Sequence, residues 1–156
     1  MNTILTDNPL SQIQTATLAT LASMLIPASE KYDVPGADDV TIMGDIIGTA
    51  RQYAELFRDG LDAIDTYARG EHGKDFVSLS IEHRQTVVDH FQNTSPHFIR
   101  SMVSVTVQCY YRDTRVMESL GMAARAPYPE GFELPQGDWT LLDPVKERGA
   151  IWRKAD

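Results

Sequence analysis

Apolar side chains recur every three or four residues along most of this chain, and this period constrains the fold more than any other feature. The pattern is clearest between residues 53 and 69, where apolar residues would share one face of a helix and charged residues the opposite face. We therefore predict a long amphipathic helix that Gly70 and Gly73 end. Its apolar face comprises Tyr53, Leu56, Phe57, Leu61, Ile64, Tyr67 and Ala68.

Two shorter helices are predicted before this one. The first carries apolar residues within 10–25 at helical spacing and stops at Pro27, which cannot continue a helix. The second carries apolar residues within 42–50 and begins at Asp38 or Asp39, either of which can cap the exposed amides of a first turn.

Further helices are predicted after the long amphipathic helix. Ser80 caps a helix that closes at Asn93. Ser95 followed by Pro96 predicts another start, because the hydroxyl can cap and proline suits the first turn. Apolar residues continue this helix to Tyr110. Alternating valines within 103–107 make a strand the competing interpretation of the segment.

A short helix completes the series. It begins at Asp113 or Thr114 and ends at Gly121. The sequence therefore predicts an all-α fold, with a domain of about five to six helices over residues 1–121.

Residues 122–156 differ in composition. Proline blocks helix formation, whereas aromatic and leucine side chains need somewhere to be buried. We therefore expect an extended C-terminal segment that packs on the chain's own helices, on a partner subunit, or on both. Its prolines are Pro127, Pro129, Pro135 and Pro144, and its large apolar residues include Tyr128, Phe132, Leu134 and Trp139.

The charge balance excludes one class of partner. Fourteen Lys and Arg stand against 22 Asp and Glu, giving a net charge of -8, so the chain lacks the cationic surface that nucleic acid binding needs.

The single cysteine, Cys109, cannot form an intrachain disulfide. Residues 1–29 contain no Lys or Arg, there is no twin-Arg pair, and no apolar run is long enough to cross a membrane. The expected location is cytoplasmic, or periplasmic if the chain is exported with a partner.

The histidines are not spaced for metal binding. His83, His90 and His97 are seven residues apart, about 10 Å along a helix, whereas ligands of one ion must each lie within about 2.1 Å of it. The glycine-rich fingerprints for nucleotides and dinucleotides and the CxxCH haem motif are also absent. We expect no metal site and no cofactor in this chain.

The candidate nucleophile and acid–base groups have simpler explanations. Cys109 lies in an apolar helical stripe, where a buried free cysteine is common. Asp59, Asp62 and Asp65 fall on the polar side of the long helix, which a solvated face explains. No catalytic residue is therefore assigned.

Adjacent aromatic residues offer a binding surface instead. Tyr110 and Tyr111 would point about 100° apart on a helix, so one should pack inward and the other outward. Tyr and Trp dominate protein interfaces because they bury large areas at little entropic cost. The candidate partner contacts are Tyr110, Tyr111, Tyr128, Phe132, Leu134 and Trp139.

Several short motifs follow one another along the chain. They are Leu25-Ile26-Pro27, Pro35-Gly36-Ala37, Gly-Lys-x-Phe-x-x-Leu-Ser at 73–80, Tyr110-Tyr111 with Asp113 and Val116, and Leu120-Gly121. The order of these motifs resembles that of the gluconate 2-dehydrogenase subunit 3 family. The tail from Pro127 to Pro144 is also similar to the C-terminal portion of some members.

This resemblance implies an accessory role. It implies a large FAD-dependent partner of the glucose-methanol-choline (GMC) type that oxidises a sugar, sugar acid or alcohol. In some members electrons pass on to a cytochrome c subunit or quinone. The small subunit would be non-catalytic and needed for folding or stability of the flavoprotein, with FAD in the partner and no cofactor here.

Two alternatives remain open from the residues alone. The chain could be an independent helical adaptor that binds an unrelated protein through its tail. It could also be a small helical enzyme that uses Asp62, Asp65 or His83 as acid and base.

Overall fold

The computed structural model describes residues 8–125, 128–129, 131 and 136–149. The chain divides into two compact units, Met1–Ala124 and Arg125–Asp156. The described residues form helices and connecting loops, and none of them forms a strand, which confirms the all-α prediction. None of the described helices is both long enough and apolar enough to span a membrane.

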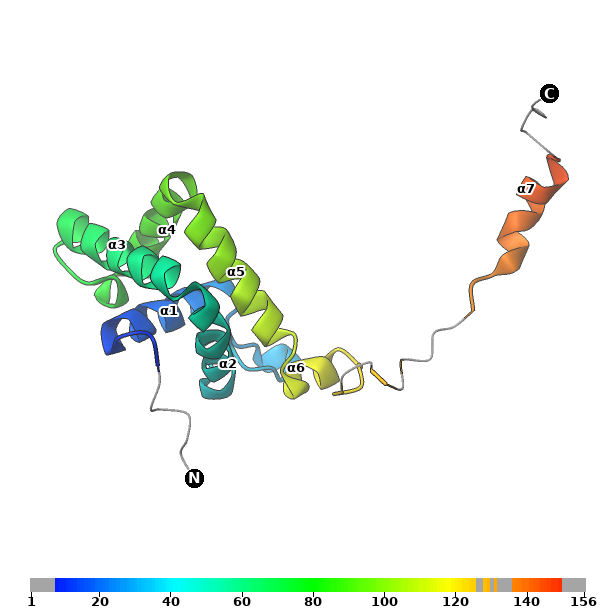
Figure 1. Ribbon diagram of the computed structural model, residues 1–156, viewed down its shortest axis with the longest axis horizontal. Coiled ribbons are helices and arrows are strands. Elements are labelled where there is room, and N and C mark those ends of the chain that lie inside the picture. The colour runs from blue at the N-terminus through cyan, green and yellow to red at the C-terminus, as the bar shows by residue number, and fades with distance from the viewer. Residues whose placement is uncertain (1–7, 126–127, 130, 132–135, 150–156) are drawn as a thin grey trace. The chain divides into compact units, whose positions relative to one another are not determined.

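Among the described residues of the first unit, six α-helices are joined by short loops and single 3₁₀ turns (Figure 1). The 3₁₀ turns are η1 (Glu30–Tyr32), η2 (Arg51–Tyr53) and η3 (Phe76–Ser78). The helices are α1 (Gln12–Leu25), α2 (Val40–Ala50), α3 (Ala54–His72), α4 (Ile81–Thr94), α5 (Pro96–Tyr110) and α6 (Thr114–Ser119).

Side-chain caps explain most of the helix starts. Ser11 forms a capping box with Gln14 at α1, and the carboxylate of Asp39 accepts the Thr41 amide at α2. The predicted caps Ser80 and Asp113 also accept amide hydrogen bonds, at α4 and α6.

The cap predicted at Ser95 is wrong. The Ser95 hydroxyl makes no capping hydrogen bond, because this residue is also the C-cap of α4, where its amide donates to the Phe91 carbonyl. Its ψ of 54° differs from the 159° found at Ser80. Proline at the first turn still begins α5, and the helix runs through the valines for which a strand was the alternative.

The end of α3 was predicted correctly at Gly73 and wrongly at Gly70. Gly73 has a φ of +67°, the left-handed conformation that glycine adopts at helix ends. Gly70 lies within the helix, because a single glycine costs a helix only about 1 kcal/mol.

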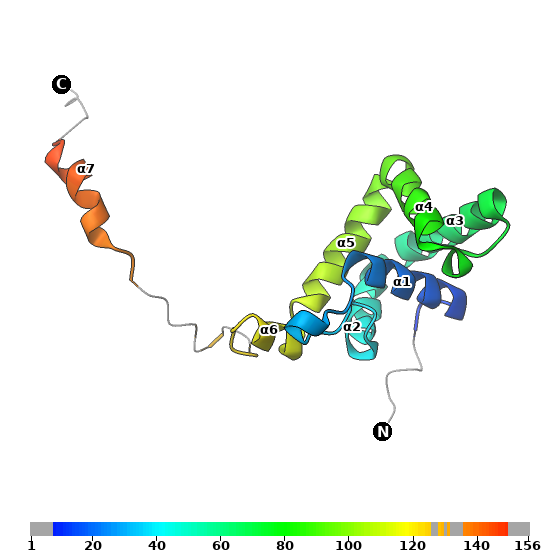
Figure 2. The ribbon, with the colours of Figure 1, turned by 180° about the vertical axis from the view of Figure 1, so that it is seen from behind.

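The core of the first unit surrounds α3, which packs against α1, α4 and α5 (Figures 1 and 2). Phe57, Leu61 and Ile64 on the predicted apolar face are almost fully buried. Tyr53 is half exposed, because it lies in η2 before the helix begins.

The second unit contains η4 (Trp139–Leu142) and α7 (Asp143–Glu147). The expectation of an extended chain is therefore wrong for residues 139–147. Pro144 lies in the first turn of α7. A backbone amide there would have no acceptor within the helix, so the proline removes no helical hydrogen bond. Asp138 caps η4 through the amide of Thr140.

Candidate protein-binding surface

The two adjacent tyrosines at the end of α5 face different environments, as predicted. Tyr110 is 4% exposed, and its hydroxyl donates a 3.2 Å hydrogen bond to the carbonyl oxygen of Pro35. Burial raises the pKa of Tyr110, so the phenol stays neutral. Tyr111 is 53% exposed and packs edge-on against Tyr110. Tyr110 is thus a core residue, whereas Tyr111 presents its ring to solvent.

The remaining interface candidates belong to the second unit. Tyr128 and Trp139 are 87% and 67% exposed. Phe132 and Leu134 lie outside the described residues. Exposed aromatic rings of this kind are suited to contact with another protein.

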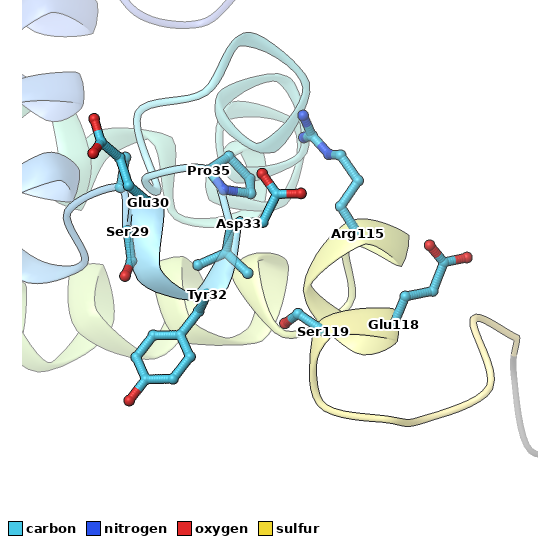
Figure 3. A pocket seen from close by; sticks show the side chains of 10 residues that line it. Ser29, Glu30, Tyr32, Asp33, Pro35, Arg115, Glu118 and Ser119 are labelled. Atoms are coloured by element: carbon cyan, nitrogen blue, oxygen red, sulfur yellow. The ribbon is translucent and has the colours of Figure 1, made fainter.

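A groove of about 650 Å³ lies between α6 and the loop that follows α1 (Figure 3). Sequence reasoning did not find it. The Pro35-Gly36 turn is the local signal, because a Cβ at Gly36 would stand 2.9 Å from the Ala28 amide nitrogen. The loop contributes Ala28, Ser29, Glu30, Tyr32, Asp33, Val34 and Pro35, and α6 contributes Arg115, Glu118 and Ser119.

The loop side of the groove is held by backbone contacts. The amides of Ser29 and Val34 each donate to the other's carbonyl, at 3.0 and 3.1 Å. Between them, η1 ends at Asp33, whose φ of 51° is a left-handed conformation that aspartate tolerates better than most residues. The hydrogen bond from Tyr110 to Pro35 fixes the far end of the loop on α5.

An ion-pair network holds the α6 side. The Arg115 guanidinium donates to Asp39 at 2.7 and 3.2 Å and to Asp113 at 2.9 and 3.0 Å. These hydrogen bonds hold the pKa of each carboxyl below its usual value and raise that of Arg115. Since the two aspartates cap α2 and α6, one arginine joins the starts of two helices.

The model of a family of dehydrogenase subunits matches residues 12–124, from the start of α1 to the end of the first unit. The chain belongs to the gluconate 2-dehydrogenase subunit 3 family. The resemblance drawn from the order of the motifs is thereby confirmed, and the chain is a component of a dehydrogenase complex. Comparisons with curated proteins and with solved structures found no match.

Several motifs of the gluconate 2-dehydrogenase subunit 3 resemblance meet at the groove. Pro35 lines it, Tyr110 holds Pro35, and Asp113 binds Arg115. All of them lie within the region that the family model matches, whereas residues 125–156 lie beyond it.

Two carboxylates of α3, those of Asp62 and Asp65, have structural roles in this family member. Asp65 is only 8% exposed, so placing it on a solvated face was wrong. Its carboxylate accepts the Phe76 amide at 3.0 Å and pairs with Arg69 at 2.8 Å, because η3 folds over that side of α3. Asp62 accepts a hydrogen bond from the side chain of Gln14 at 2.9 Å.

Three of the four histidines stack on other rings. His83 stacks on His72 with ring centroids 4.4 Å apart, and His90 stacks on Tyr67 at 4.1 Å. Across the described part of the chain, no three His, Cys, Asp or Glu side chains are grouped as a metal site would need. The His72–His83 contact was not predicted, because the two residues come from different helices.

Proposed function

We propose that this chain is the non-catalytic small subunit of an FAD-dependent dehydrogenase of the GMC type, acting on a sugar, sugar acid or alcohol. The observation that carries the proposal is the family match over residues 12–124. In this proposal the large subunit holds FAD and performs the oxidation, and this chain binds no cofactor.

The role proposed for the small subunit is to stabilise the folded flavoprotein. A subunit that binds only the folded form stabilises it by mass action, by about 2.7 kcal/mol when its free concentration is 100 times Kd. A well-packed domain suits this role, because little entropy is lost when a rigid surface docks. The nearly complete burial of Phe57, Leu61 and Ile64 gives the first unit such a core.

The exposed aromatic residues are proposed as partner contacts. Tyr111 lies at the end of α5, and Tyr128 and Trp139 belong to the second unit. Each exposes at least half of its surface, so each can bury a large ring on docking.

Co-expression tests the function directly. A GMC-type flavoprotein from the same organism is produced with and without this chain, and we measure soluble yield, the flavin absorbance and dye-linked dehydrogenase activity. We expect the chain to co-purify with the flavoprotein and to raise all three. An equally soluble and active flavoprotein without the chain, or turnover by this chain alone, contradicts the proposal.

Paired substitutions test the aromatic contacts. Tyr128→Ala with Trp139→Ala should weaken binding to the flavoprotein by about 30-fold or more, because truncating an interface aromatic often costs about 2 kcal/mol. Tyr53→Ala, at a half-exposed aromatic in η2, is the matched control and should bind like wild type. Equal affinity of the double variant and wild type would show that the second unit's aromatics lie outside the interface.

A further inference from the structure

The groove beside α6 has the size and surface of a site for a few side chains. Binding pockets commonly span roughly 300–1,000 Å³, and this groove measures about 650 Å³. Ala28, Val34 and Pro35 give it an apolar lining. Tyr32 also lines the groove, and its ring is exposed (Figure 3).

The charge of the groove selects what can bind there. Among the described residues, the carboxylates of Glu30, Asp33 and Glu118 make no side-chain hydrogen bond or ion pair. The groove's one arginine, Arg115, is already bound by two aspartates. The lining therefore combines apolar contact with unneutralised negative charge, and it favours a cationic group beside an apolar one.

The groove is preformed in the unbound chain. The paired amides of Ser29 and Val34 hold the loop, and Arg115 holds α6 to the start of α2. A segment docking here would therefore lose little affinity to ordering of the groove itself.

We propose that this groove binds a segment of the large dehydrogenase subunit in which Arg or Lys adjoins apolar side chains. The proposal rests on the function proposed above, which supplies the partner, and adds the place and chemistry of contact. A second copy of this chain is disfavoured as the occupant, because its own net charge is -8. The groove also lies wholly within the region matched to the family of dehydrogenase subunits.

Removing the three free carboxylates tests the proposal in the full-length chain. The variant carries Glu30→Gln, Asp33→Asn and Glu118→Gln, and asparagine tolerates the left-handed backbone at position 33. The probe is the FAD-loaded GMC-type flavoprotein of the co-expression experiment, and Kd is measured by calorimetry at low and high salt. We expect binding at low salt to weaken about tenfold or more, with a smaller salt dependence than wild type.

A control variant removes equal charge elsewhere. Glu55→Gln, Asp59→Asn and Glu71→Gln lie on exposed positions of α3, away from the groove. This variant should keep wild-type affinity. If both variants weaken binding equally, net charge and not the groove controls association, and the proposal is wrong.

The remaining outcomes separate this proposal from the proposed function. If wild type binds the flavoprotein and the groove variant binds equally well, the subunit role stands and the groove proposal is overturned. If wild type does not bind the flavoprotein, both fail.

Amide hydrogen exchange of the wild-type complex gives a readout that needs no substitution. Amides of residues 28–35 and 114–119 should exchange more slowly when the flavoprotein is bound. Unchanged exchange in both segments would overturn the proposal even if the groove variant folds poorly.

Discussion

The Arg115 guanidinium binds both carboxylate oxygens of Asp39, a residue 76 positions earlier in the chain, at 2.7 and 3.2 Å. This pair joins the first turn of α6 to the N-cap of α2. Because Arg115 and its neighbours on α6 line one side of the groove, the pair also fixes that side relative to the core.

Arg115→Gln should lower the free energy of unfolding by about 1 kcal/mol at neutral pH, or roughly 2–4 °C in Tm. The arginine is 44% exposed, so solvent screening keeps the loss modest despite four hydrogen bonds. Urea unfolding followed by circular dichroism measures the change. Arg112→Gln removes an exposed ion pair with Asp45 at 3.3 Å and a long hydrogen bond to Cys109 Sγ at 4.0 Å, and it should cost less than half as much.

The contribution of this network should vanish in acid. Arg115 holds the pKa values of Asp39 and Asp113 below the ordinary 3.8, so their stabilisation is present above that pH. It is lost as the pH falls through the lower native values, because both carboxyls then take up protons. Unfolding curves of wild type and Arg115→Gln should therefore converge in strong acid, and a constant gap between them would contradict the network's role.

Gly60 and Gly70, both in α3, should respond oppositely to alanine. A Cβ at Gly60 would stand 2.4 Å from the Phe98 ring, so Gly60→Ala should destabilise the fold by about 1–3 kcal/mol. A Cβ at Gly70 meets no atom within 4 Å, and Gly70→Ala should stabilise it by about 0.5–1 kcal/mol. Thermal unfolding of the two variants checks both signs.

Asp65→Ala should cost about 1–3 kcal/mol, because it leaves the amide of Phe76 without an acceptor in a buried position. Asp59→Ala, on the exposed side of the same helix, should change stability by less than about 0.5 kcal/mol. Similar unfolding midpoints for the two variants would show that the Asp65 contact contributes little.

Tyr110→Phe should lower stability by about 0.5–1.5 kcal/mol, because the carbonyl oxygen of Pro35 loses its hydrogen bond from the phenol. Tyr111→Phe removes an exposed hydroxyl and should leave the unfolding midpoint unchanged. Equal midpoints for the two variants would show that the hydroxyl of Tyr110 adds nothing to the anchoring of the loop.

The helices could be predicted because their causes are local. Asp39, Ser80 and Asp113 cap amides two or three residues ahead, and Gly73 ends α3 through its own backbone conformation. The failures at Ser95 and Gly70 have local reasons as well, since one residue serves two helices and the other is tolerated inside one.

The candidate site was only partly predictable. The adjacency of Tyr110 and Tyr111 was enough to place one ring inward and the other outward. The groove was not predicted, because its two sides lie about 80 residues apart in the chain and meet only when α6 packs beside the loop after α1.

The sequence by itself determined the all-α class, most helix starts and ends, and the family resemblance, because each depends on residues close together or on motif order. Only the tertiary structure decided which polar residues are buried and which carboxylates remain free. Asp65 is covered by η3 and Asp39 meets Arg115 across the fold, whereas Glu30 and Glu118 keep no partner among the described residues. Periodicity assigns a residue to a face of a helix, but the packing of distant segments determines what covers that face.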